Sequence, residues 1–233
     1  MGRDSVATIL LAAGVSRRMV GEDKLWADLG GEPLIAHPLR TLAALDEVDR
    51  LVLVAPAERH RTLRDLAGGL GVELRCVEGG ERRQDSVAAG LAAAPEADWY
   101  LVHDGARPLV TAALACRVLA GAHAHGAAVP ATTLADTVKR VDADGRVVET
   151  VERDDLRAAQ TPQCFAGPLL RRAHDSARSL ASEAATDDAA LVERLSEPVH
   201  MVEGDPVNVK VATPADLELV RALLAARGSA GDG

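Results

Sequence analysis

Residues 6–19 read VATILLAAGVSRRM, and this stretch decides the fold. Its first six residues are nearly all apolar, which is typical of a strand covered on both faces of a sheet. Small residues, Ala12, Ala13 and Gly14, follow at once. In open α/β sheets, ligands bind beyond the carboxyl ends of the strands. We therefore expect the functional residues in the loops that follow the strands.

The pattern of this first segment repeats along the chain. Short apolar runs alternate with Ala/Leu/Arg-rich segments of helical length. The predicted strands are 6–11, 51–55, 73–77, 99–103 and 127–130, and the predicted helices between them are 33–45, 58–70, 85–94 and 111–123. This alternation predicts an α/β fold with a mostly parallel sheet flanked by helices.

The alternation breaks after Pro130. Residues 137–141 and 146–152 flank an Asp-Gly turn, which predicts a β-hairpin that projects as an arm. Further on, 208–211 is interpreted as a short late strand. Thr213 and Pro214 mark the start of a last helix that runs to about residue 227 and leaves a frayed tail. We expect one domain over 1–233, with 133–160 forming the arm.

Composition excludes several classes of protein. The 233 residues carry a formal net charge of −9, which disfavours a nucleic-acid partner. An apolar fraction of 48% excludes general disorder. We expect no membrane span, because no run approaches 20 apolar residues. Three widely spaced cysteines favour neither a disulfide framework nor a zinc site, and fit a reducing cytoplasm.

The loop after the first predicted strand combines small residues with two cations, Arg18 and Lys24. Exposed backbone amides in such a loop can hold phosphate, and the two cations add fixed positive charge beside them. The alternative is a strand-to-helix turn with solvated basic side chains. The loop lacks both the G-x-G-x-x-G pattern of dinucleotide-binding proteins and the G-K-[ST] of a Walker loop.

Two further strand-end loops carry polar residues. Residues 79–86 place a glycine pair close to Asp85 and Ser86, which offer groups to a base or ribose, or alternatively cap the next helix. Asp104 ends the fourth predicted strand, where a carboxylate is well placed to hold Mg²⁺ against a triphosphate, with Arg107 close by. The alternative there is a helix-entry turn in which Asp104 bonds its own backbone.

These motifs, in this order, resemble the 2-C-methyl-D-erythritol 4-phosphate cytidylyltransferases. The resemblance runs from about Val6 to Leu224, and the blocks that carry it are residues 12–19 (AAGVSRRM), 80–87 (GERRQDSV), 102–108 (VHDGARP), 136–139 (DTVK), 160–163 (QTPQ), 186–189 (TDDA) and 208–211 (NVKV). The first block is shared with many nucleotidyltransferases, whereas DTVK, TPQ and NVKV in this order are far more specific. The resemblance implies a Rossmann-like nucleotidyltransferase sheet.

The resemblance also implies roles for individual residues. It places Arg18, Lys24 and Lys210 around the triphosphate as the catalytic set, and implies Mg²⁺ as cofactor, held at Asp104. The residues implied for nucleotide binding are Ala12, Ala13, Gly14, Gly80, Glu81, Asp85 and Ser86. Those implied for substrate binding are Asp104, Arg107, Asp136, Thr137, Arg153, Thr161 and Thr186. The family is usually a homodimer built through the arm, which reaches the neighbouring subunit.

The implied reaction transfers CMP from CTP to 2-C-methyl-D-erythritol 4-phosphate and releases pyrophosphate, in non-mevalonate isoprenoid synthesis. The closest alternative acceptor is ribitol 5-phosphate, another five-carbon polyol phosphate. A molybdopterin-type nucleotidyltransferase is a weaker alternative, supported only by residues 21–34. A non-catalytic nucleotide-binding module is the alternative from another class. A dinucleotide oxidoreductase is disfavoured by the incomplete glycine pattern.

Overall fold

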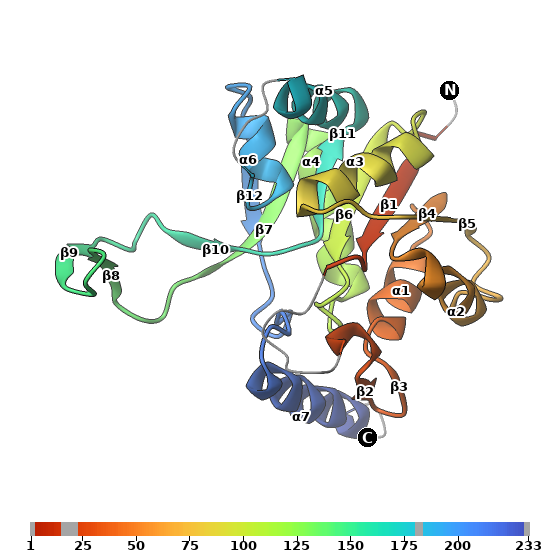
Figure 1. Cartoon of the computed structure of the whole chain (residues 1–233), viewed down its shortest axis with the longest axis horizontal. Helices are drawn as coiled ribbons and strands as arrows, with labels where there is room; N and C mark the ends of the chain where they lie inside the picture. The colour runs from red at the N-terminus through yellow and green to blue at the C-terminus, as the bar shows by residue number, and fades with distance from the viewer. Residues whose placement is uncertain (1–2, 15–22, 180–183, 231–233) are drawn as a thin grey trace.

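The computed structural model describes residues 3–14, 23–179 and 184–230. Its centre is an eight-stranded sheet with the order β10-β7-β11-β6-β1-β4-β5, in which β12 lies beside β7 (Figure 1). These strands are β1 (Val6–Leu11), β4 (Arg50–Val54), β5 (Glu73–Val77), β6 (Trp99–Asp104), β7 (Ala127–Thr133), β10 (Arg157–Ala159), β11 (Gln163–Ala166) and β12 (His200–Glu203). The β6-β1-β4-β5 half is wholly parallel, as predicted.

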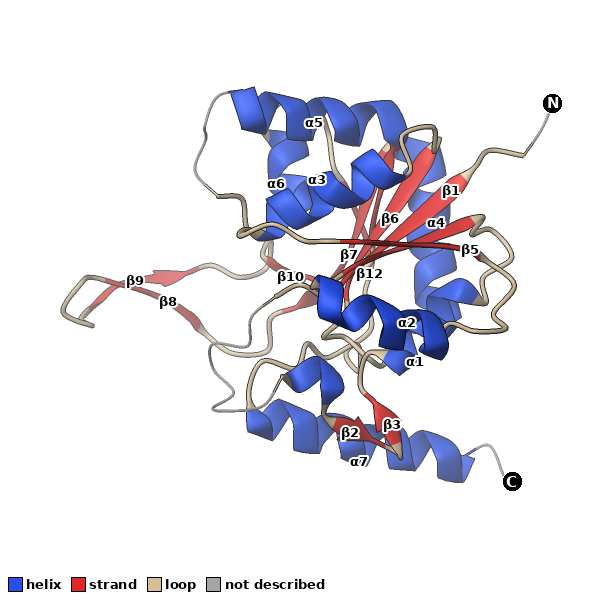
Figure 2. Ribbon diagram, turned by 45° about the vertical axis from the view of Figure 1, so that its right-hand side comes forward, coloured by secondary structure: helices blue, strands red, loops and turns tan. Residues whose placement is uncertain are grey.

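Helices cover both faces of this sheet (Figure 2). The described helices are α1 (Ala36–Ala43), α2 (His60–Leu66), α3 (Arg83–Ala93), α4 (Ala112–His125), α5 (Gly167–Ser179), α6 (Asp188–Glu193) and α7 (Pro214–Ala230), with 3₁₀ turns η1 (Lys24–Trp26) and η2 (Ala57–Arg59). Successive residues of a strand point to opposite faces. On β1, Leu10 therefore belongs to the core cluster that includes residues of α1, α2, α4 and α7, whereas Ile9 belongs to the cluster that includes residues of α3, α5 and α6. The mostly parallel α/β fold is confirmed.

Strands β10 and β11 are the main difference from the sequence-based expectation. Both run antiparallel to their neighbours, and β11 lies between β6 and β7. The chain returns from the arm at this point and fills the gap between two strands that follow one another in sequence. That insertion depends on where the arm leaves the sheet, so no local pattern of residues 157–166 predicts it.

Residues 208–211 are not a strand, so that prediction is wrong. The late strand is β12, which pairs in parallel with β7. The 208–211 segment is instead tied to loops. Val211 donates its N–H to the Ala106 carbonyl at 2.8 Å, and the side-chain Nδ2 of the buried Asn208 donates to the Thr161 carbonyl at 2.8 Å. These bonds hold the 208–211 segment outside any sheet, beside the end of β6.

The last helix begins as predicted and ends later. Thr213 and Asp216 cap α7 reciprocally: the Asp216 N–H donates to the Thr213 hydroxyl at 3.3 Å, and the Thr213 N–H donates to the Asp216 carboxylate at 2.7 Å. The helix continues to Ala230, beyond the predicted end near Arg227. Within the described residues, the helices are too short or too polar to cross a membrane.

The predicted hairpin forms a separate two-stranded ribbon of β8 (Val138–Val141) and β9 (Val147–Val151), and it projects from the sheet (Figure 1). Its Asp-Gly turn places Gly145 at φ +80°, a conformation that favours glycine. Val141 and Val147 are register partners, so they share one face of the ribbon. Another small ribbon, β2 (Asp28–Leu29) with β3 (Glu32–Pro33), follows η1.

Candidate active site

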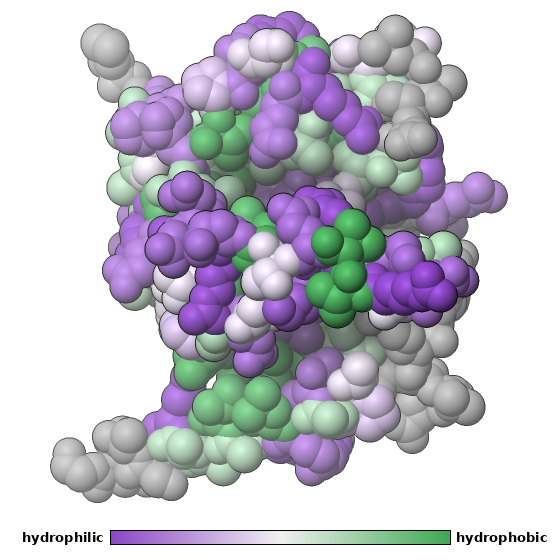
Figure 3. Space-filling view, turned by 90° about the vertical axis from the view of Figure 1, so that its left-hand side faces the viewer, coloured by the Kyte–Doolittle hydropathy of each residue, from purple (hydrophilic) through white to green (hydrophobic). Residues whose placement is uncertain are grey.

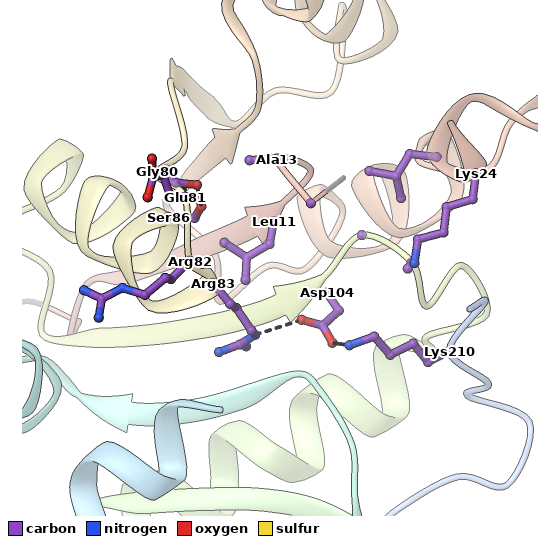
Figure 4. A pocket seen from close by; sticks show the side chains of 14 residues that line it. Leu11, Ala13, Lys24, Gly80, Glu81, Arg82, Arg83, Ser86, Asp104 and Lys210 are labelled. Carbon is purple, nitrogen blue, oxygen red and sulfur yellow. Dashed lines mark hydrogen bonds and ion pairs between the residues drawn. The ribbon is translucent and has the colours of Figure 1, made fainter. Parts of the chain in front are cut away.

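A cleft of about 390 Å³ lies at the carboxyl ends of the parallel strands (Figure 4). It is built by the loop after β1, the loop between β5 and α3, the turn after β6, the start of η1 and the 208–211 segment. The residues that line it are Leu11, Ala13, Gly14, Lys24, Leu25, Gly80, Glu81, Arg82, Arg83, Ser86, Asp104, Gly105, Ala106 and Lys210. Eight of them belong to the set expected from sequence.

Two glycine-containing loops form one wall of the cleft. A Cβ atom on Gly79 would lie 2.3 Å from the Cβ of Ala13, so only glycine allows the two loops to approach this closely. The backbone N–H of Gly80 donates to the Ser86 hydroxyl oxygen at 3.1 Å, which fixes the second loop against α3. A base or a ribose can therefore approach the backbone closely on this wall.

Asp85 has a different role from its neighbours in the second loop. Its carboxylate accepts from the Arg82 backbone N–H at 3.2 Å and from the Arg82 guanidinium, which closes a capping box at the start of α3. Asp85 does not line the cleft. The helix-capping interpretation of Asp85 is therefore confirmed, and a direct nucleotide contact by Asp85 stays a prediction.

Asp104, the last residue of β6, is the charged centre of the cleft. One carboxylate oxygen accepts from Lys210 Nζ at 2.7 Å, and the other accepts from Arg83 Nε at 3.2 Å (Figure 4). Burial alone raises the pKa of the Asp104 carboxyl, but the charges of Arg83 and Lys210 outweigh it and hold that pKa well below its usual range. Asp104 is therefore a carboxylate at neutral pH.

A buried histidine holds the backbone at this point. Burial lowers the pKa of His103 to about 4, so its ring is neutral. Nε2 donates to the Arg107 carbonyl at 3.1 Å, which leaves Nδ1 to accept from the Thr161 hydroxyl at 3.1 Å. The Thr161 oxygen in turn accepts the Asp104 N–H at 3.0 Å. Thr161 thus helps to fix the direction of Asp104, and its predicted contact with substrate remains a prediction.

Arg107 fixes the strand-end turn to the segment that carries Lys210. Its side chain is largely buried, and Nη1 donates to the Asn208 carbonyl at 2.8 Å. Arg107 is not among the residues that line the cleft. Its observed contact is structural, and its expected contact with substrate stays a prediction.

The lining of the cleft carries a positive balance. Four of the lining residues are cations, Lys24, Arg82, Arg83 and Lys210, and two are carboxylates, Glu81 and Asp104, so the formal charge of the lining is +2. The chain as a whole is at −9. A local positive cleft in an acidic protein favours an anionic ligand, because clefts focus the field of the charges around them.

Several predicted residues lie away from this cleft. Ala12 is buried and donates its N–H to the Val54 carbonyl at 2.7 Å. On the arm and the strands that lead into it, Asp136 and Thr137 are exposed, and Arg153 donates to the Ala135 carbonyl. Thr186 is exposed just before α6. Arg18 lies outside the described residues.

Among the charged residues that line the cleft, sequence reasoning missed two, Arg82 and Arg83. Their signal was present, since both stand directly after the glycine pair of the second loop. Arg82 is the extended N-cap residue of α3 and Arg83 is its first helical residue, and here Arg83 reaches Asp104 whereas Arg82 pairs with Asp85. The adjacency of two arginines did not reveal which one faces the carboxylate.

The donor set at Asp104 fits a magnesium ion that arrives with a ligand. Among the described residues there is no group of three or more His, Cys, Asp or Glu side chains that could form a preformed cage. Mg²⁺ commonly takes one or two protein carboxylates together with phosphate oxygens. An ionised carboxylate in a cleft with a positive balance of charge matches that mode.

Fold and cleft define an α/β protein with a positively balanced cleft, suited to an anionic ligand, at the carboxyl edge of its sheet. Residues 6–226 match the family model described as "2-C-methyl-D-erythritol 4-phosphate cytidylyltransferase". A protein of that name from Nocardia farcinica is 46% identical over 228 residues, covering 97% of this chain and 96% of the relative. The chain belongs to the 2-C-methyl-D-erythritol 4-phosphate cytidylyltransferase family, and its class is that of a nucleotidyltransferase.

Solved structures agree with this assignment. The crystal structure of 4-diphosphocytidyl-2C-methyl-D-erythritol synthase from Anaerococcus prevotii superposes with a TM-score of 0.84 at 30% identity, over 96% of this chain and 100% of that one. That of 2-C-methyl-D-erythritol 4-phosphate cytidylyltransferase from Thermus thermophilus gives 0.78 at 36% identity, over 94% and 98%. The family resemblance predicted from sequence is confirmed.

Proposed function

We propose that this cleft transfers a cytidylyl group from CTP to 2-C-methyl-D-erythritol 4-phosphate and releases pyrophosphate. The observation that carries the proposal is the Lys210–Asp104–Arg83 cluster at the centre of a positively balanced cleft. A triphosphate and a monophosphate must meet there, and both are anions. The site must therefore offset the negative charge of both substrates so that they can approach each other.

The transfer needs no general base. A phosphate oxygen of the acceptor, already ionised at neutral pH, attacks the α-phosphorus of CTP in line. A P–O bond to that phosphorus forms as the bond to pyrophosphate breaks. Asp104 is unsuited to proton transfer, because its depressed pKa and its two charged partners keep it ionised. His103 is equally unsuited, because both of its ring nitrogens are committed to internal hydrogen bonds.

The cations of the cleft stabilise the negative charge of the phosphate groups. Lys24 lines the cleft from η1, and Lys210 lines it from the 208–211 segment. Lysine suits a phosphate as a point charge. Asp104 is the residue that would hold Mg²⁺, and the ion when bound would neutralise charge on the phosphate oxygens. Arg18 completes the proposed catalytic set from outside the described residues.

The methylerythritol acceptor is favoured over ribitol 5-phosphate by the comparisons. The relative from Nocardia farcinica and the two solved structures all carry names that specify methylerythritol. Both acceptors are five-carbon polyol phosphates, so the cleft's charges alone do not separate them. Comparing the turnover rates with the two acceptors tests the choice between them.

We expect purified protein to release pyrophosphate from CTP with Mg²⁺ when 2-C-methyl-D-erythritol 4-phosphate is supplied. The rate with ribitol 5-phosphate should be lower by about 10²-fold, since a site shaped for one polyol leaves polar groups unpaired with another. A coupled pyrophosphate assay measures both in parallel. Equal rates, or release with ribitol 5-phosphate alone, would contradict the acceptor. CTP binding without turnover by either acceptor would instead indicate a binding module.

The arm is proposed to join two copies of the chain. Three of the most exposed large hydrophobic residues, Val141, Val147 and Val148, are on it, with exposed fractions of 54%, 61% and 63%. Seen from the side of the arm, hydrophobic side chains stand outermost among hydrophilic ones (Figure 3). Thr137 and Arg153, expected at the acceptor phosphate, do not line the cleft of their own chain. A homodimer would bring the arm of one subunit to the cleft of the other.

A charge on the arm should separate the two subunits. We expect Val147→Asp to reduce the mass found by sedimentation equilibrium from about twice 24.3 kDa to once that value. The KM for the acceptor should rise by about 10-fold, the loss of a hydrogen bond to a charged group. Leu219→Asp, at a residue 48% exposed on α7, is the matched control. A wild-type protein that is an active monomer would refute the dimer.

A further inference from the structure

A line of ion pairs runs from the cleft into the protein behind it. It begins at Lys210 and Asp104, passes through Arg83 at the start of α3, and reaches Asp188, the first residue of α6, where Asp188 Oδ2 accepts from Arg83 Nη1 at 2.6 Å. The other Asp188 oxygen lies 2.9 Å from Nε2 of the buried His174 on α5. Asp188 itself is fully buried and does not line the cleft.

Arg83 is held between two carboxylates. Nε meets Asp104 and Nη1 meets Asp188, while Nη2 is buried and has no hydrogen-bond partner within the described residues. A guanidinium is planar and rigid, so anchoring one of its nitrogens sets the direction of the others. Asp188 is thus the group that aims Arg83 Nε at Asp104.

A contribution to stability alone does not explain why a carboxylate is fully buried here. Burying such a charge is costly, and an apolar replacement for a buried ion pair is often neutral or stabilising. Burial raises the pKa of Asp188, but Arg83 and His174 outweigh it and lower that pKa overall, so the charge is retained. The retained charge has one connection toward the cleft, which is Arg83.

The two cations on Asp104 differ in their freedom to move. The Lys210 side chain is 45% exposed, whereas that of Arg83 is 21% exposed and tied to Asp188. Lys210 is therefore the cation that can leave Asp104 and pair with an incoming phosphate. Arg83 is the partner that stays.

We propose that Asp188 is a positioning residue for the transfer: through Arg83 it keeps the Asp104 carboxylate directed into the cleft when Lys210 leaves it for the triphosphate. This inference rests on the proposed function, since it assigns a task to the same site. It predicts that the charge of Asp188 affects turnover without contact between Asp188 and any substrate.

Asp188→Asn removes that charge with little change of shape. We expect kcat and the apparent affinity for Mg²⁺ to fall by about 10–100-fold, the usual effect of losing a group that orients a metal-binding side chain. The KM for CTP should change less than about twofold, because Asp188 does not line the cleft. Asp187→Asn is the matched control, because it makes the same change at the adjacent residue. The Asp187 side chain caps α6 by accepting from the Ala190 N–H, and asparagine can make the same cap.

Arg83→Lys is an independent variant that tests whether Asp188 acts on Asp104 through Arg83. A single ammonium cannot span both carboxylates as the guanidinium does, so we expect a similar loss of kcat and of Mg²⁺ affinity. If Asp188 acts through Arg83, adding Asp188→Asn to Arg83→Lys should cost little more. Additive losses would indicate an unconnected structural role and overturn the proposal.

The outcomes separate this inference from the proposed function. A wild-type protein that releases no pyrophosphate would refute the function itself. A wild-type protein that turns over while Asp188→Asn matches Asp187→Asn would overturn only the positioning role. If Asp188→Asn does not fold, as judged by circular dichroism, Arg83→Lys decides: wild-type kcat and Mg²⁺ dependence in that variant would equally overturn it.

Discussion

Alanine at Lys210 should reduce kcat by about 10²–10³-fold, and alanine at Lys24 should do the same. This is the usual cost of removing one group that stabilises charge in a transition state. The two lysines enter the cleft from different elements, η1 and the 208–211 segment, so each adds its own positive charge to the site of the triphosphate. The Lys210→Ala substitution also removes one of the two cations that pair with Asp104. Steady-state pyrophosphate release at saturating substrate measures both effects.

The control for these variants removes a cation elsewhere. Arg172 is a surface residue, 57% exposed, that pairs with Glu197 away from the cleft. Surface pairs of this kind contribute little to stability, so Arg172→Ala should keep wild-type kcat. If both lysine variants also kept near-native kcat, the electrostatic mechanism would be wrong.

The second large effect is expected at Asp104. Asp104→Asn keeps the size of the side chain but removes the one carboxylate at the centre of the cleft. We expect kcat at fixed Mg²⁺ to fall by about 10²-fold or more, because the cleft loses its proposed metal ligand and Arg83 and Lys210 lose their shared counter-charge. A Mg²⁺ titration of turnover measures the effect, and an unchanged Mg²⁺ dependence would contradict the metal role.

Acid stability supplies an independent measurement on the same variant. The pKa of Asp104 is lower in the folded protein than in the unfolded chain, where aspartate titrates near 3.9. Its contribution to the free energy of unfolding is therefore present above about pH 4 and is lost as pH falls toward the folded pKa. We expect the part of the acid destabilisation due to Asp104 to be absent in Asp104→Asn. Identical pH profiles of unfolding in urea would show that Asp104 carries no such charge coupling.

Local patterns predicted the scaffold of this site well. Strand β1 was predicted at its observed bounds, because each strand buried on both faces leaves a continuous apolar run. The rule that ligands bind at strand ends then pointed to the loops that carry Gly80 and Asp104. Lys210 was found only through the family resemblance, since a lone lysine in an extended segment has no local signal.

Contacts between distant segments were not predictable in this way. The partner of Arg83 behind the cleft, Asp188, is 105 residues away, and ion pairing leaves no periodicity in a sequence. The structure also decided that the Thr161 hydroxyl accepts the Asp104 N–H, and that residues 208–211 form a loop held by hydrogen bonds instead of a strand. The contacts of Thr161 depend on how β11 inserts beside β6, because Thr161 lies just before β11.

The sequence by itself determined the alternating strands and helices of the first 130 residues, the hairpin, the start of the last helix and the strand ends at which chemistry would gather. It did so because burial on a strand or a helix face leaves a period of about two or 3.6 residues that can be read locally. Only the tertiary structure decided which charges meet around Asp104 and which of them are fixed. A contact between side chains from separate elements is set by the packing of those elements, and the energy of an ion pair depends on distance and burial that no short stretch of residues encodes.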